Sequence, residues 1–217
     1  MKILLITIVA AAALCIGDCV VCAHDADVSQ TQEYWILYPR TSGQCGLGGE
    51  NDVVCKRRNL QGEWVSEEES VFFDPRFDNV PTVFFVHGNP TPGSRVFQMG
   101  RQMWRLLEQR ASGAPFRLVL WYWPDDRRMS RRTAQIESTR SDLHAYYLAR
   151  WIHRMAPNPA TCFVGYSFGT QIVAGALELL SGGSVRGRQL DEPCMLWHPT
   201  RVMLLGSAGE SHWVGAN

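Results

Sequence analysis

Residues 162–170 read CFVGYSFGT. This apolar run ends in Gly-x-Ser-x-Gly, and apolar residues then recur at helical spacing over 172–180. A buried strand that turns sharply into a helix through this motif is typical of a nucleophile elbow, in which the serine takes a strained backbone conformation between small neighbours. We therefore predict that Ser167 stands at the apex of the turn, between Gly165 and Gly169. The alternative is an ordinary strand, turn and helix with a solvated serine.

The same alternation of strand and helix patterns extends along most of the chain. Wholly apolar runs at 82–86 and 116–123 are typical of strands buried on both faces, and a last strand is expected at 201–206. Helical spacing separates these strands at 96–107 and 136–155. The pattern predicts an α/β fold with a mostly parallel sheet flanked by helices.

The chain ahead of this core predicts a smaller β region. Strand candidates lie at 34–38 and 63–73. We therefore expect an N-terminal β meander within residues 24–79 and the α/β core within residues 80–217. The length suits one domain with an extension better than two domains.

Several polar residues follow directly after predicted strands. In a parallel sheet the carboxyl ends of the strands meet at one edge, where ligands bind. His87, Asp125, Ser167 and the segment 207–212 would therefore share that edge. Their convergence predicts one site.

Two motifs carry a resemblance to a known superfamily. HGNP at 87–90 follows the third predicted strand and GYSFG at 165–169 follows the fifth, and through them the chain resembles the α/β-hydrolase superfamily over roughly residues 80–208. The resemblance implies a hydrolase of esters or related acyl compounds, such as an esterase, lipase, thioesterase or amidase, with no cofactor. HGNPTP also resembles a loop of haloalkane dehalogenases, but those enzymes carry an aspartate at the elbow, so Ser167 favours acyl chemistry.

The resemblance also implies roles for individual residues. Ser167 is the expected nucleophile, and the backbone N–H groups of Asn89 and Phe168 are the expected oxyanion hole. Four neighbours are expected to support the site without reacting: His87, Gly88, Gly165 and Gly169.

The base and acid of a catalytic triad have no ordinary place in this chain. A serine hydroxyl attacks poorly unless a histidine within about 3 Å accepts its proton and an acid orients that histidine. In the resembled superfamily the acid usually follows the seventh strand and the histidine the eighth, whereas this chain ends soon after its sixth predicted strand. Three interpretations stay open: a truncated or degenerate form of a longer hydrolase, inactive or weak as it stands; an unconventional triad with His212 as base and Glu210 or Asp125 as acid; and a non-catalytic binding or scaffold role on a hydrolase fold.

The remaining histidines have less specific settings. His144 and His153 fall on the predicted long helix, where we expect them at its surface or rim. His198 precedes the last predicted strand. None of the three is a good candidate for a ligand or a base.

The amino-terminal segment has the three parts of a secretory signal peptide. Lys2 precedes an apolar run at 3–14, and small residues end at Ala23. We expect cleavage after Ala23, a secreted or periplasmic protein, and no stable membrane span after cleavage. An uncleaved anchor is the alternative.

Four cysteines follow the predicted cleavage site: Cys45, Cys55, Cys162 and Cys194. Cys45 and Cys55 bracket a glycine-rich loop, and an exported chain meets oxidising conditions, so we predict a disulfide between them, with free thiols as the alternative. The chain after the cleavage site has no close pair of Cys or His residues, so no metal site is expected.

The composition gives no sign of a polyanionic partner. Lys plus Arg and Asp plus Glu both number 21, so the formal net charge is +0. Neither nucleic acid nor an anionic membrane surface is therefore expected as a partner. The expected partner is a small-molecule acyl substrate.

Overall fold

The computed structural model describes residues 32–39, 53–89, 91–123, 131–155, 160–192 and 200–207, without the side chains of 131–135. These residues form seven strands, four α-helices and one 3-10 helix. In chain order the elements are β1 (Gln32–Pro39), β2 (Val53–Arg58), β3 (Trp64–Glu67), α2 (Glu69–Phe72), η1 (Pro75–Phe77), β4 (Thr82–Val86), α3 (Gly93–Ala111), β5 (Phe116–Trp121), α4 (Arg131–His153), β6 (Thr161–Tyr166), α5 (Phe168–Leu180) and β7 (Arg201–Leu205).

The strands form one sheet in the order β3-β2-β1-β5-β4-β6-β7. β1, β5, β4, β6 and β7 run parallel to one another, whereas β2 is antiparallel to both β1 and β3. The predicted α/β class with a mostly parallel sheet is confirmed. The described helices include none that is both long enough and apolar enough to cross a membrane.

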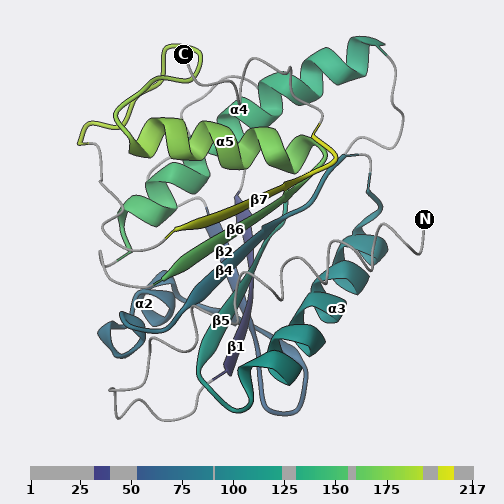
Figure 1. Ribbon diagram of the computed structural model, residues 1–217, viewed down its shortest axis with the longest axis vertical. Helices are drawn as coiled ribbons and strands as arrows, with labels where there is room; N and C mark the ends of the chain where they lie inside the picture. The colour runs from purple at the N-terminus through teal and green to yellow at the C-terminus, as the bar shows by residue number, and fades with distance from the viewer. Residues whose placement is uncertain are drawn as a thin grey trace.

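β4 lies between β5 and β6 in the sheet, and the chain extends from it in both directions. α3 connects β4 to β5 on one side, and α4 connects β5 to β6 on the other side of β4. Right-handed crossovers in opposite directions put their helices on opposite faces, and Figure 1 shows α3 on one face with α4 and α5 on the other. Ligands of open α/β sheets bind where this change of direction occurs, beyond the carboxyl ends of the strands.

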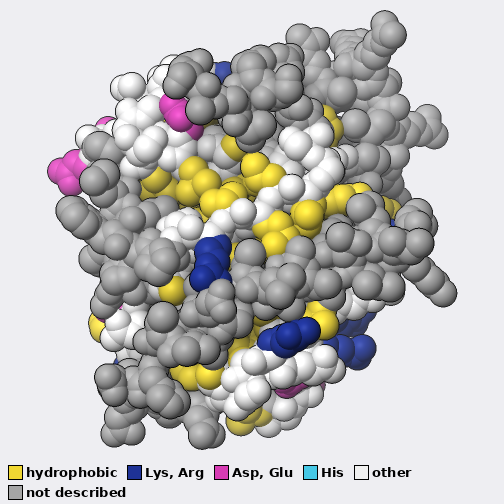
Figure 2. Space-filling view, in the orientation of Figure 1, with side chains coloured by type: hydrophobic (Ala, Val, Ile, Leu, Met, Phe, Trp, Pro, Cys, Tyr) yellow, Lys and Arg dark blue, Asp and Glu magenta, His cyan; other side chains and the backbone are white. Residues whose placement is uncertain are grey.

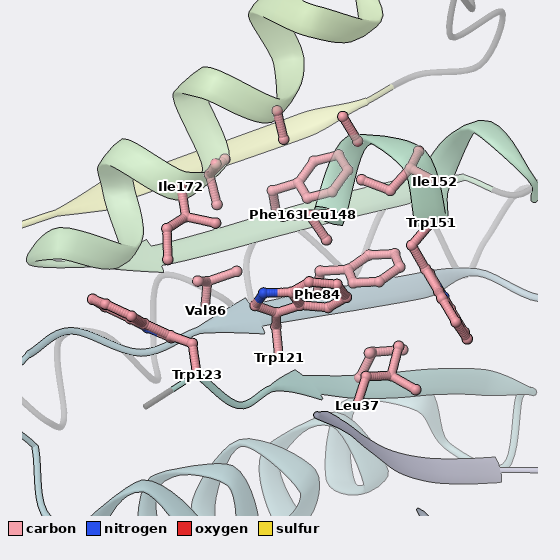
Figure 3. Close-up of a cluster of buried hydrophobic side chains, with 14 of the residues drawn as sticks. Leu37, Phe84, Val86, Trp121, Trp123, Leu148, Trp151, Ile152, Phe163 and Ile172 are labelled. Carbon is pink, nitrogen blue, oxygen red and sulfur yellow. The ribbon is translucent and has the colours of Figure 1, made fainter. Parts of the chain in front are cut away.

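Two apolar clusters fix the helices to the sheet. Phe84, Trp121 and Phe163 belong to the cluster under α4 and α5, which Figure 3 shows. Val83 and Phe85 belong to the cluster under α3. Successive residues of a strand point to opposite faces, so a strand covered by helices on both faces is apolar at every position. This is why the run at 82–86 could be identified from the sequence.

The early strands differ from the sequence prediction at two places. β2 was not predicted, because its second half is the charged run 56–58. The strand predicted at 63–73 ends at Glu67, and α2 follows it. Within α2, Phe72 turns inward and packs edge-on against Trp35 and Trp151 at ring distances of 5.2 and 5.1 Å. Burial of this ring stabilises a helical turn where a strand would have left it outside the core.

β1 is tied to β5 by a buried ion pair. Arg117 Nε lies 3.3 Å from Glu33 Oε2, and the two side chains are only 4% and 2% exposed. The same carboxylate accepts a hydrogen bond from Trp35 Nε1 at 3.0 Å and lies 3.4 Å from Arg57 Nη1. Arg117 also stacks on Phe72, with its guanidinium 4.4 Å from the ring centre. The predicted N-terminal extension is therefore part of the main sheet.

Replacing Arg117 by Met should lower the free energy of unfolding by about 3 kcal/mol, because the Glu33 carboxylate would stay buried with only its weaker partners. The double variant Glu33→Gln, Arg117→Met should recover at least half of that loss, because no buried charge is left. Urea denaturation of the three proteins measures both values. A double variant less stable than Arg117→Met would contradict the argument.

Candidate functional site

Ser167 is the residue that joins β6 to α5, and its backbone is strained. It has φ 53° and ψ −122°. Ser112, another serine with positive φ, has φ 48° and ψ 38°, which is the ordinary left-handed conformation at a helix end. Ser167 lies outside that region, and such conformations cost about 1–3 kcal/mol each and concentrate at functional sites.

Close packing around the turn maintains this conformation. A Cβ at Gly165 would lie 2.8 Å from the carbonyl oxygen of Gly169, and a Cβ at Gly169 would lie 2.7 Å from the carbonyl oxygen of His87. The first turn of α5 therefore rests on the end of β4, at a distance that only glycine permits. The Ser167 N–H donates to the Leu205 carbonyl at 2.9 Å, and the Thr170 hydroxyl donates to the Ser167 carbonyl at 2.6 Å.

The loop after β4 lies directly against Ser167. A Cβ at Gly88 would stand 2.5 Å from the Ser167 Cβ, 2.7 Å from the Tyr166 carbonyl oxygen and 3.2 Å from the Ser167 Oγ. Any side chain at Gly88 would therefore displace the serine. Glycine at this position lets the backbone at 88–89 run alongside the hydroxyl.

His87 locks this loop and is not free to act as a base. The Trp123 backbone N–H donates to His87 Nε2 at 3.3 Å, so Nδ1 carries the ring proton and donates to the Gly88 carbonyl at 2.8 Å. Trp123 Nε1 also donates to the His87 carbonyl at 2.8 Å. Burial lowers the pKa of His87 to about 4, so the ring is neutral near pH 7.

Asn89 follows Gly88 and is also buried. Neither the oxygen nor the nitrogen of its side-chain amide has a hydrogen-bond partner within the described part of the chain. Buried amides without partners are rare because each costs free energy. The loop beside Ser167 thus carries an unsatisfied polar group as well as a strained neighbour.

His144 lies in the interior, contrary to the prediction for the helix that carries it. It is buried on the inner face of α4, and its ring centre lies 5.6 Å from that of Trp123. The ring centre of Trp123 also lies 5.7 Å from that of His87, so one indole packs against both histidines. Burial, helped by His87 and Arg140, lowers the pKa of His144 to about 3. The prediction failed because the buried face of α4 also carries polar residues, namely Glu137, Ser141 and Asp142.

The site residues predicted from sequence divide into two groups. The structure brings together Ser167, Phe168, Gly88 and Asn89, with His87 behind them. The candidate base His212 and the candidate acids Glu210 and Asp125 lie outside the described residues. Within the described ranges no histidine or carboxylate forms a hydrogen bond with the Ser167 hydroxyl.

Thr170 lies beside Ser167 but was given no role from the sequence, whereas Ser207 begins the segment that was predicted to reach this edge of the sheet. Their hydroxyl oxygens lie 3.0 Å apart. Thr170 is three residues into the turn that follows Ser167, a position where its hydroxyl reaches the serine carbonyl. The contact fixes the chain that leaves β7 beside the first turn of α5.

The structure describes only one of the two cysteines of the predicted disulfide. Cys55 is buried in β2 and is bonded to no other described cysteine, and burial raises the pKa of its thiol to about 12. Cys45 lies outside the described residues. The pairing therefore stays a prediction. No group of three His, Cys, Asp or Glu side chains that could hold a metal ion is present among the residues that the structure describes.

Comparison with known proteins adds no relative. No protein-family model, no curated protein and no solved structure matches this chain. Arguments about function therefore rest on the geometry around Ser167.

The two buried histidines should make the fold sensitive to acid. Both are neutral in the folded chain, with pKa values of about 4 and about 3, against 6.5 for a free histidine. Below pH 6.5 the unfolded chain binds more protons, so the free energy of unfolding should fall by up to about 1.4 kcal/mol per pH unit for each histidine, down to about pH 4. Denaturant unfolding at several pH values measures this slope.

The substitution His144→Leu should roughly halve that slope, because one of the two titrating groups is removed. His153→Leu serves as the control, since His153 lies on the same helix but is only half-buried. An unchanged slope in His144→Leu would refute the assignment.

Proposed function

We propose that this protein is a serine hydrolase that cleaves esters or related acyl compounds, with Ser167 as the nucleophile. The observation that carries the proposal is the strained backbone of Ser167, at φ 53° and ψ −122°, packed against Gly88 at the change of direction of the sheet. A serine hydroxyl raised above the strand ends is open to a carbonyl carbon. Strain of this kind is kept where the surrounding packing enforces it, which is common at reactive residues.

Two backbone amides support an oxyanion hole beside that hydroxyl. Phe168 is the first residue of α5, so its N–H has no acceptor within the helix, and the positive end of the helix dipole adds to it. Asn89 follows Gly88 in the loop that touches Ser167, and its N–H donates to no group in the described part of the chain. Amides held in advance where negative charge develops stabilise the transition state of acyl transfer.

The reaction we propose has two steps. The Ser167 Oγ attacks the acyl carbon while a base takes its proton, the carbonyl oxygen becomes an oxyanion facing Asn89 and Phe168, and the alcohol leaves with the proton. Water then attacks the acyl-serine by the same route and releases the acid. His87 does not serve as the base in this scheme, because both of its ring nitrogens are engaged.

His212 is the proposed base, with Glu210 or Asp125 as its orienting acid. Ser207, whose hydroxyl contacts Thr170, begins the segment that carries His212. Five extended residues reach at most about 17 Å, which is enough to return to the serine from this anchor. The apolar leader at 3–14 further supports export of the protein to the periplasm or the medium.

Replacing Ser167 by Ala should lower kcat/KM for p-nitrophenyl butyrate by about a thousand-fold or more, because the nucleophile is lost. It should also abolish covalent labelling by a fluorophosphonate probe, a readout that does not depend on the natural substrate. Ser112→Ala is the matched control, since it removes another serine with positive φ and should leave both readouts unchanged. Equal hydrolysis and labelling in the Ser167→Ala and unmodified proteins would leave a non-catalytic scaffold as the function.

Replacing His212 by Ala tests the base separately. The substitution should reduce hydrolysis by about a thousand-fold at pH 7 and leave a residual rate that rises with pH, because hydroxide then replaces the lost base. His153→Ala is the control and should retain full activity. Unchanged activity in His212→Ala would remove this histidine from the mechanism without affecting the case for Ser167.

A further inference from the structure

The charges of this neutral chain are not evenly placed, and α3 carries a basic face. The helix contains four arginines, Arg95, Arg101, Arg105 and Arg110, with a single glutamate, Glu108. In the described part of the chain none of these arginines forms an ion pair with a carboxylate. Arg57, Arg76, Arg117, Arg140, Arg154 and Arg186 all do, elsewhere on the molecule. Figure 2 shows Lys and Arg side chains over the area that α3 occupies in Figure 1.

The hairpin between β2 and β3 extends this basic face. The Trp64 ring meets Tyr34 edge-on at 4.9 Å, and Tyr34 stacks on Trp104 of α3 at 5.5 Å. Arg58 pairs with Trp64 across the hairpin, and Arg58 and Arg101 both act electrostatically on the Tyr34 hydroxyl. The hairpin and the middle of α3 thus form one continuous surface.

The hairpin also presents an apolar tip on that surface. Leu60, in the turn after Arg58, is 101% exposed, so its side chain buries nothing in the fold. Trp64 is 37% exposed and leaves part of its indole outside. Glu63 is the acidic residue of the turn, and Asn59 donates to its carboxylate at 3.3 Å. A fully exposed leucine beside a partly exposed indole contributes little to the packing of the described part of the chain.

We propose that this surface, formed by Arg58, Leu60, Trp64, Arg101 and Arg105, binds the face of an anionic lipid bilayer. The three guanidinium groups would lie among the lipid phosphates, Trp64 at the level of the headgroups, and Leu60 in the outer edge of the acyl chains. Basic residues near such a surface, together with a buried apolar side chain and an interfacial indole, are the elements of peripheral membrane binding.

A bilayer fits these residues better than an acidic protein does. A folded partner must offer a pocket shaped for Leu60, because a single projecting side chain without a surrounding apolar patch makes a poor protein interface. A bilayer accepts the side chain anywhere along its surface. Electrostatic attraction then needs only negative charge, which matches Arg101 and Arg105, since neither forms an ion pair in the described part of the chain.

The surface lies toward the edge of the sheet opposite to Ser167. β2 is antiparallel to β1 and ends at Arg58, one residue after Arg57, which pairs with Trp35. The hairpin that follows therefore lies toward the amino end of β1, whereas Ser167 follows the carboxyl end of β6. Docking through this surface would therefore leave Ser167 uncovered. The inference does not depend on the proposed hydrolase activity.

Sedimentation with vesicles tests the inference. The protein should bind vesicles of phosphatidylcholine containing about a third phosphatidylglycerol and should not bind vesicles of phosphatidylcholine alone. Arg101→Gln with Arg105→Gln should weaken binding by about twenty-five-fold, or five-fold for each charge removed, and high salt should release the protein. Leu60→Asn should also weaken binding, because the inserted apolar side chain is lost while the charge of the surface stays the same.

Two substitutions on the opposite layer serve as controls. Arg188→Gln removes a charge from the loop after α5, where Arg188 forms a β-bridge with Val185, and Ile136→Asn changes an exposed apolar residue of α4. Both should bind like the unmodified protein, and all variants should keep the unmodified thermal midpoint. Absence of binding to anionic vesicles would overturn the proposal. Binding that Leu60→Asn leaves unchanged, together with equal affinity for soluble heparin, would also overturn it and indicate a polyanionic partner without a lipid surface.

Discussion

The contact between the first turn of α5 and the end of β4 is the constraint on which the rest of this structure depends. Gly169 rests on the carbonyl group of His87, and Gly88 rests on Ser167. These contacts leave no room for a Cβ at either glycine, so the backbone between β6 and α5 must take the strained path through Ser167. The buried apolar clusters on both faces of the sheet supply the free energy that keeps this arrangement closed.

The topology explains why polar groups gather at this point. β4 has β5 on one side and β6 on the other, and both are reached through helices. The loop after β4 therefore lies beside the residues that follow both neighbouring strands. Trp123 after β5 fixes His87, while Ser167 after β6 lies against Gly88. The same geometry keeps His87 neutral, because burial that secures the loop also disfavours its charged form.

Much of the fold could be predicted from the sequence, and the failures have physical causes. The strands at 82–86 and Thr161–Tyr166 are apolar throughout because both faces are covered, so they stand out without knowledge of their neighbours. β2 could not be predicted from its own charged run, because Arg57 is paired with Glu33 and Glu67, which belong to other strands. The burial of His144 likewise depends on Trp123, which lies about twenty residues earlier in the chain. For the site, the motifs at 87–90 and 165–169 predicted residues that the fold brings together, but a base and an acid require long-range contacts that local patterns do not encode.

The position of β4 between β5 and β6 has a consequence for how the molecule forms its site. The loop at 87–89 and the turn at Ser167 are about eighty residues apart along the chain, and they meet only after α3 and α4 have both completed their crossovers. Contacts of such long sequence separation form late and are lost together. A fragment cut between β5 and β6 would contain either the glycine loop or the strained serine, never both. Whatever chemistry the pair supports thus appears only once the whole sheet has assembled.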